Sequence, residues 1–326
     1  MLRKLFCFKQ SGFLQAYKNK NKIKTKGYIA LAITSILWGT TWVASKLGVQ
    51  QIPALQMAAI RQFIGGACFL LFFIGYKKLP LPTAKQFGWI ILLALLMFVG
   101  ANGLSTWSLN YIPTGLSALI GALYPLSVVL IEIIFYKKNN ATPLTFLGMA
   151  LGIVGVGVVF YENAFQAHAK GFGYGLALSI IAMLCWSFAT IFISSSKMKL
   201  NAYYSIGLQM FVGSFLLYFF AVMAKQTVAI SSISSKAWWV IAYLVIAGSI
   251  IAFVAFIYSL KTLPPAISSL YAYLNPLIAM VVAYFVLDEK LTWNILWGAI
   301  ITLAGVYLVN YSIKRNDKKV IEQNEM

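Results

Sequence analysis

Ten stretches of 19 to 24 residues, almost free of charge, follow one another along this chain of 326 residues. About 20 apolar residues cross the hydrocarbon core of a bilayer as a helix, so each stretch is long enough to span a membrane. Only Lys46, Arg61 and Glu132 bring a charge into them. The stretches cover residues 28–49, 53–75, 86–109, 113–136, 143–161, 172–194, 203–224, 237–260, 264–287 and 292–312. The pattern predicts an all-α membrane protein with ten transmembrane helices.

The composition agrees with this prediction. The chain is 61% apolar and only 10% charged, whereas a soluble domain is about half apolar and about a quarter charged. The connections are too short to hold a soluble domain. Because backbone groups inside hydrocarbon must satisfy their own hydrogen bonds, helices are expected rather than irregular segments. The strands of a membrane barrel would be about half as long and strictly alternating, and that pattern is absent.

Basic residues predict the orientation, because they are enriched on the cytoplasmic side of a membrane. With the N-terminus inside, 20 of the 26 basic residues fall on the cytoplasmic side and five fall outside, while Arg61 lies within a span. The outer five are Lys46, Lys170, Lys225, Lys236 and Lys290. Both termini are therefore predicted to be cytoplasmic. The net charge of +19 indicates contact with the lipid bilayer and not with nucleic acid.

The two tails, residues 1–27 and 313–326, hold much of this charge. The N-terminal tail has no continuous apolar stretch, so a cleavable signal peptide is not expected. A disordered basic tail and a short interfacial helix are both compatible with its composition.

Internal similarity indicates a duplication. Residues 107–126 and 258–277 are identical at eight of twenty positions without a gap, including Pro125 with Pro276. The register also pairs Trp38 with Trp186, Arg61 with Gln209, Gly65 with Gly213, Gly148 with Gly298 and Gly155 with Gly305. The two copies are residues 28–161 and 172–312, each with five helices. Since five is odd, the second copy enters the membrane from the opposite side, which predicts two inverted five-helix repeats.

Several of these stretches resemble a known family. LWGTTWVASKLG, AAIRQFIGGA around Arg61, and NPLIAMVVAYFVLDEKLTWNILWGAIITLAGVYLV are similar to the drug/metabolite transporter superfamily, specifically its EamA-type members. The resemblance covers about residues 28–312. It implies ten helices, two EamA repeats in an inverted arrangement, and carriage of small metabolites, often outward, across a bacterial plasma membrane.

Charged residues in hydrocarbon are candidates for function. Arg61 and Glu132 are too far apart in depth to form a direct ion pair, by the helical rise of about 1.5 Å per residue. Arg61 is expected either to cap carbonyls or to hold a substrate carboxylate, and Glu132 either to couple protons or to lie at the inner interface. Lys46 is expected to extend outward to the interface.

Small residues and prolines have structural interpretations as well. Gly148, Gly152 and Gly155 lie on nearly one helical face and favour close helix packing, and Gly298 and Gly305 repeat that spacing. Pro125 and Pro276 lie inside their stretches, where a missing N–H permits either a kink useful for gating or a static bend.

Signatures of an enzyme are absent from the sequence. His168 is the only histidine, no phosphate-binding loop occurs, and Asp288 and Glu289 lie at a helix end, where capping or solvation is expected. Cys7, Cys68 and Cys185 are far apart and predict no disulfide framework. No metal and no cofactor are expected.

The substrate path is expected between the repeats near the midplane. Trp38 and Trp42 share a helical face, with Thr34 one turn earlier, and Asn102 and Thr106 share another. The other candidates for substrate binding are Trp107, Tyr124, Trp186, Tyr258, Tyr271 and Asn275. Each of these residues has a second interpretation as packing or as part of an interfacial aromatic belt. Together they suit a flat or amphipathic organic molecule, such as an amino acid or a nucleobase-like metabolite, better than a bare ion.

The sequence thus predicts a secondary transporter of a small organic metabolite. A membrane-embedded enzyme or a structural membrane protein is the alternative. The metabolite, the coupling ion, the direction of transport and the choice between a monomer and a homodimer stay open.

Overall fold

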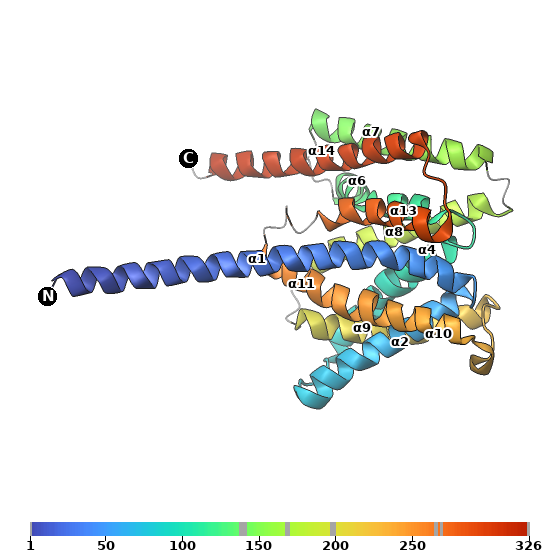
Figure 1. The fold of residues 1–326 in the computed structure, drawn as a ribbon, viewed down its shortest axis with the longest axis horizontal. Helices are drawn as coiled ribbons and strands as arrows, with labels where there is room; N and C mark the ends of the chain where they lie inside the picture. Colours follow the sequence, from blue (N-terminus) through green and yellow to red (C-terminus); the bar gives the residue numbers. More distant parts are fainter. Residues whose placement is uncertain are drawn as a thin grey trace.

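The computed structural model describes residues 2–136, 142–166, 170–195, 200–263, 267 and 270–324, and all regular structure in these residues is helical. Eight of its helices are long and apolar enough to cross a membrane, and two further apolar helices are shorter. Figure 1 shows them packed side by side as a bundle, with both chain ends on the same side. The predicted all-α class with ten transmembrane helices is confirmed.

Five membrane-spanning segments, each of one or more consecutive helices and called a rod below, form the first half of the bundle. The first is α1 (Leu2–Val49), and the second is α2 (Ala54–Leu70), which continues as the π-helix η1 (Leu71–Tyr76). The third joins α3 (Ala84–Ala94), the π-helix η2 (Leu95–Gly103) and α4 (Leu104–Ser108). The fourth comprises α5 (Thr114–Ala122) and α6 (Tyr124–Tyr136), and the fifth is α7 (Pro143–Gln166).

The second half repeats this plan. It consists of α8 (Phe172–Ser195), α9 (Ala202–Met223), a rod of α10 (Ser235–Tyr243), the π-helix η4 (Leu244–Ile251) and α11 (Ala252–Thr262), then α13 (Tyr271–Leu287) and α14 (Trp293–Asn324). A single short 3₁₀ turn, η3 (Ile230–Ser232), precedes α10. The third rod of each half therefore contains a π-helical segment at a corresponding place.

The inversion of the two halves is visible where α7 meets α14. A Cβ added at Gly148 would lie 2.7 Å from the carbonyl oxygen of Gly305, and one added at Gly155 would lie 2.6 Å from that of Gly298. The two helices are therefore antiparallel, and only glycine lets their backbones approach so closely. Because Gly148 corresponds to Gly298 and Gly155 to Gly305, the two contacts exchange under a pseudo-two-fold axis. The predicted close packing of these glycines is confirmed.

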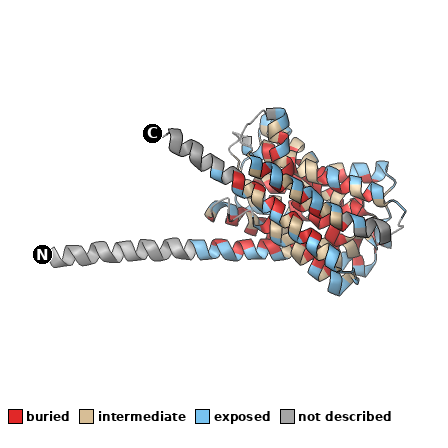
Figure 2. Ribbon diagram, turned by 90° about the horizontal axis from the view of Figure 1, so that it is seen from above, coloured by how far each residue is buried: buried red, intermediate tan, exposed pale blue. Residues whose placement is uncertain are grey.

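The helices α2 and α9 repeat the same relationship. A Cβ on Gly66 would meet the backbone of Phe211, and one on Gly207 would meet the Cβ of Phe69 at 2.4 Å, so these helices are also antiparallel. Phe63 stacks on Phe211, with ring centroids 5.4 Å apart. Figure 2 shows the resulting bundle with buried residues in its interior and exposed residues on its outside.

One predicted helix is interrupted. Residues 113–136 were expected to form a single helix, but α5 ends at Ala122 and α6 begins at Tyr124. The break precedes Pro125, which has no N–H to continue the hydrogen-bond ladder and restricts the conformation of the residue before it. Pro276, in contrast, lies inside the uninterrupted helix α13. The two equivalent prolines therefore have different local consequences.

Both tails belong to long helices. The backbones of α1 and α14 extend into both tails, so the N-terminal tail is helical and continues directly into the first span (Figure 1). Four of the lysines counted on the cytoplasmic side, Lys137, Lys138, Lys197 and Lys199, lie outside the described residues, and so does His168. The cytoplasmic placement of the tails stays a prediction.

Candidate functional site

A cavity lies between the two halves of the bundle. Its volume is about 180 Å³, several times the share of about 30 Å³ that one water molecule takes. Its wall comes from α1, α2, the third and fourth rods, α8, α11 and α13. On α1 the lining runs from Trp38 to Ser45, toward the end of the helix at Val49 and away from the chain termini. The cavity therefore occupies the half of the bundle opposite the termini.

Aromatic rings close the cavity at its inner end. The Trp38 ring contacts the rings of Phe253, Phe256 and Tyr271, with centroid separations of 5.1, 5.0 and 5.3 Å. Its indole N–H donates to the carbonyl of Gly248 at 3.2 Å. Beneath them lie Leu31 and Leu263, which are buried together with Tyr271. We call Trp38, Phe253, Phe256 and Tyr271 the aromatic floor.

Side chains of α6 and α13 meet at this floor. The Tyr271 hydroxyl donates to the Tyr124 hydroxyl at 3.2 Å, and the two rings stack with centroids 6.5 Å apart. With its amide oriented to satisfy its neighbours, Asn275 donates to the carbonyls of Ser35 and Tyr271 at 3.0 and 3.2 Å. These contacts join α13 to both α6 and α1.

Arg61 is the only charged residue among the described lining residues. It is 6% exposed, and its Nε donates to the Ser249 hydroxyl at 3.0 Å. A Cβ on Gly248 would lie 2.7 Å from its Nη2, so this glycine makes room for the guanidinium. Both of its neighbours belong to the π-helix η4, a type of segment that recurs at functional sites. No carboxylate of the described residues pairs with Arg61.

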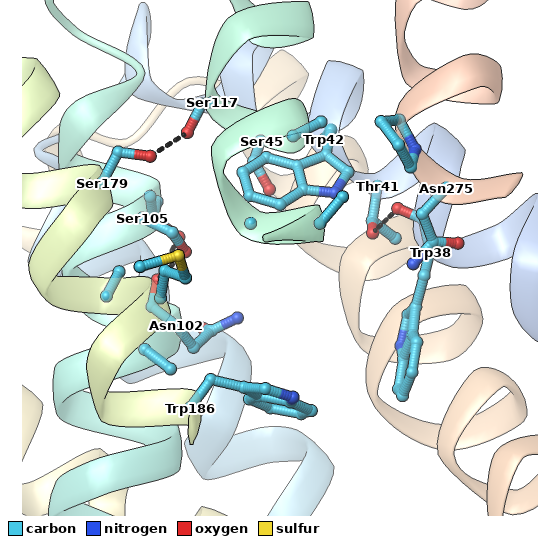
Figure 3. Close-up of a pocket in the computed structure, with 18 of the residues that line it drawn as sticks. Trp38, Thr41, Trp42, Ser45, Asn102, Ser105, Ser117, Ser179, Trp186 and Asn275 are labelled. Atoms are coloured by element: carbon cyan, nitrogen blue, oxygen red, sulfur yellow. Dashed lines mark hydrogen bonds between the residues drawn. The ribbon is translucent and has the colours of Figure 1, made fainter. Parts of the chain in front are cut away.

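Neutral polar groups line the opposite wall. The Gln62 amide donates to Asn102 Oδ1 at 2.9 Å, which fixes the Asn102 amide, and Figure 3 shows its nitrogen turned toward the cavity. The Ser117 hydroxyl lies 3.0 Å from that of Ser108 and 3.1 Å from that of Ser179, joining α4, α5 and α8. This wall offers donors and acceptors without charge.

Seven of the nine residues predicted to bind substrate line the cavity, together with Arg61 and Thr106: Trp38, Trp42, Asn102, Tyr124, Trp186, Tyr271 and Asn275. Figure 3 shows Trp38 and Trp186 on facing sides of its lower part. The structure thus gathers side chains from six of the predicted helices around one space.

Four other predicted positions lie elsewhere. The Trp107 ring packs on Tyr174 with centroids 5.6 Å apart, and Tyr258 lies half-buried on α11 outside the lining. Thr34 is buried and donates to the carbonyls of Ala30 and Ala252. Glu132 is half-buried on α6, forms no ion pair with Arg61 and does not line the cavity. Thr34, Tyr258 and Glu132 lie closer to the end with the termini than the cavity does. Trp107 lies at the depth of the cavity, but its ring points toward Tyr174.

The sequence reasoning missed several small polar lining residues: Thr41, Ser45, Ser105, Ser117 and Ser179. Thr41 and Ser45 lie three and seven residues after Trp38, which places them on the same face of α1. Helical spacing from Trp38 could therefore have identified both.

Each half of the chain also matches a known family. Residues 25–161 and 173–311 each match the EamA-like transporter family, so the two matches coincide with the two halves of the bundle. The chain belongs to the EamA-like transporter family. This multi-pass membrane protein is accordingly a transporter, and the family does not imply an enzymatic reaction.

Several bacterial transporters are similar to nearly the whole chain. The uncharacterized transporter YvbV of Bacillus subtilis is 28% identical over 93% of this chain and 97% of its own length. The uncharacterized inner membrane transporter YedA of Escherichia coli is 26% identical over 86% of this chain and 91% of its own length. The uncharacterized transporter YoaV of Bacillus subtilis is 23% identical over 89% of this chain and 98% of its own length. A solved protein crystal structure, 14% identical, shares the fold with a TM-score of 0.61 over 89% of this chain and 98% of its own.

Charged contacts join the loops of this EamA transporter at the end opposite the termini. The half-buried Lys46 does not simply extend outward, because its Nζ donates to the carbonyls of Leu109 and, at 3.3 Å, Ile112. The Glu289 carboxylate accepts from the N–H groups of Thr114 at 2.8 Å and Gly115 at 3.3 Å. It thus caps α5 from another part of the chain, which agrees with the expected capping role.

Metal and thiol chemistry find little support in the described residues. No group of three or more His, Cys, Asp or Glu side chains that could hold a metal was found among them. Cys68 and Cys185 are free.

Proposed function

We propose that this EamA transporter is a secondary carrier that moves a small organic carboxylate, such as an amino acid, through the cavity by alternating access. The observation that carries the proposal is the single buried charge of Arg61 on the cavity wall. A buried cation without a carboxylate partner is costly, and an anionic substrate group would compensate for it.

The local geometry of Arg61 supports this role. Its Nε is held by Ser249, while Nη2 lies beside Gly248, next to the methyl group of Thr41. A planar guanidinium binds a carboxylate with two parallel hydrogen bonds, which a lysine cannot reproduce. Asn102, which Gln62 holds, supplies a further amide on the cavity wall.

The aromatic residues suit the organic part of such a substrate. Trp42 and Trp186 line the cavity, and Trp38 and Tyr271 form its floor. Indole and phenol rings bury large apolar surfaces and still offer a polar edge. An amphipathic molecule with a carboxylate fits this combination of groups, and a bare inorganic ion does not.

The pseudo-two-fold arrangement supports alternating access. In inverted-repeat carriers, one repeat rocks against the other around a site at their interface. The cavity lies on the side away from the termini, and the aromatic floor separates it from the other side. With the termini in the cytoplasm, this conformation faces outward, and release on that side corresponds to export. The name of YedA supports a bacterial inner membrane as the location.

A ligand screen followed by flux tests this function. The purified transporter is screened by thermal shift against amino acids and against their amides, which lack the carboxylate charge. The best ligand is then assayed for counterflow in liposomes. We expect stabilisation by the acids only, and saturable counterflow that Arg61→Gln lowers at least tenfold.

The control removes an exposed cation away from the cavity. Lys236→Gln, in which the lost charge is exposed, is expected to keep full counterflow. Equal stabilisation by acids and amides would refute the carboxylate assignment, and turnover of the ligand without flux would favour a membrane-embedded enzyme.

A further inference from the structure

A second hollow opens on the outside of the bundle, away from the central cavity. It lies between α2 with η1 on one side and α9, η4 and α11 on the other, and its volume of about 460 Å³ exceeds that of the central cavity. Every side chain that lines it is apolar or aromatic, apart from the Cys68 thiol and the Tyr203 hydroxyl. Phe72 and Val254 are 47% and 41% exposed, so the groove faces the surrounding bilayer.

Two lysines stand on aromatic rings that belong to this groove. Lys261 Nζ lies 4.5 Å from the centroid of the Tyr203 ring, and Lys77 Nζ lies 5.9 Å from that of Phe72. Both lysines are exposed. Lys77 follows the end of η1 and Lys261 lies in the last turn of α11, so both are at the end of the bundle where the chain termini lie.

Going toward the membrane surface, the apolar wall comes first and the lysines follow, in the same order as the acyl chains and the phosphate of a phospholipid. Along α11, seven residues separate Val254 in the groove from Lys261, which corresponds to about 10 Å of helix. An acyl chain would therefore lie on apolar side chains, while a phosphate at the membrane surface would meet the lysines. Basic residues close to a membrane surface attract anionic lipids.

We propose that this groove is a binding site for an anionic glycerophospholipid of the leaflet on the side of the termini. One acyl chain occupies the groove, and the phosphate contacts Lys77 and Lys261. The site differs from ordinary lipid contact because it selects by headgroup charge. The proposal does not depend on the substrate of the carrier.

The test measures which lipid stays bound to the purified protein. Protein in mild detergent is mixed with equal amounts of phosphatidylglycerol and phosphatidylcholine, and bound lipid is counted by native mass spectrometry. We expect severalfold more phosphatidylglycerol than phosphatidylcholine on the parent protein. The double variant Lys77→Gln with Lys261→Gln is expected to retain both lipids equally.

A matched control removes the same charge at the opposite end. Lys225→Gln with Lys236→Gln is expected to keep the preference for phosphatidylglycerol. Equal retention by the parent, or a preference that survives in Lys77→Gln with Lys261→Gln, would overturn the proposal.

The exposed Cys68 thiol allows the groove to be blocked after folding. In a Cys7→Ser and Cys185→Ser background, a bulky maleimide is attached to Cys68 of the folded protein. We expect the modified protein to lose its bound phosphatidylglycerol. An unchanged elution volume in size-exclusion chromatography shows that the protein is still folded. Retention as before would place the lipid outside the groove and refute the proposal.

Discussion

The indole ring of Trp38 meets that of Trp186, its counterpart in the other repeat, edge to face with centroids 6.5 Å apart and planes at 88°. The two repeats thus contact each other through equivalent residues at the inner end of the cavity. A rocking motion of one repeat against the other has to change this contact, so the aromatic floor is the place where opening toward the termini would begin.

Three cavity residues are expected to matter for transport. Trp38→Ala, Tyr124→Ala and Asn275→Ala each remove a lining side chain, and each is expected to lower counterflow at least tenfold while the folded yield stays near normal. Trp107→Phe and Tyr258→Phe are the controls, because the structure places both residues outside the cavity. Unchanged flux in all three alanine variants would remove this cavity from the substrate path.

Access to the cavity is expected from one side only. In a variant without native cysteines, Ser105→Cys on the cavity wall is expected to react with a membrane-impermeant thiol reagent in intact cells. Leu31→Cys is expected to stay unmodified, because Leu31 is buried below the aromatic floor. The measurement is the fraction labelled, and faster labelling of Leu31→Cys than of Ser105→Cys would contradict the described conformation.

Both chain ends are expected to face the cytoplasm, because 20 of the 25 basic residues other than Arg61 fall on that side. In a variant without native cysteines, Lys319→Cys is expected to resist an impermeant thiol reagent in intact cells and to react after lysis. Lys236→Cys, at the opposite end, is the positive control. Labelling of Lys319→Cys before lysis would reverse the orientation.

The glycine contact between α7 and α14 is expected to be intolerant of any side chain. In Gly155→Ala, the new Cβ would lie 2.4 Å from the Thr302 nitrogen, and overpacking of this kind costs about 1–3 kcal/mol. We expect a clearly lower melting temperature in detergent. Gly157→Ala is a matched control on the same helix, because nothing lies within 4 Å of its Cβ. Equal melting temperatures would argue against the close approach.

The cap that Glu289 provides is expected to contribute modestly to stability. Glu289→Gln removes the negative charge at the N-terminus of α5, which we expect to cost about 1 kcal/mol. Asp288→Asn is the control, since its left-handed backbone, with φ of 54°, tolerates asparagine. Thermal unfolding in detergent measures both variants, and an effect of Asp288→Asn as large as that of Glu289→Gln would speak against a specific cap.

The number, length and duplication of the helices could be predicted from the sequence. The thickness of a bilayer sets the length of each apolar stretch, and an odd number of helices in each copy requires the inversion that α7 and α14 display. Aromatic and amide residues at equivalent depths also indicated most of the cavity wall.

Only the tertiary structure decided which side chains share one space. The repeat register pairs Trp107 with Tyr258 at mirrored depths in the membrane, but it does not determine the direction in which either ring points around its helix. The contact of Arg61 with Ser249 spans 188 residues, and Glu289 caps a helix 175 residues earlier in the chain. Such contacts depend on how ten helices rotate and pack against one another. The position of a residue within its apolar stretch indicates how deep it lies in the membrane, whereas the partner of its side chain is set by this packing.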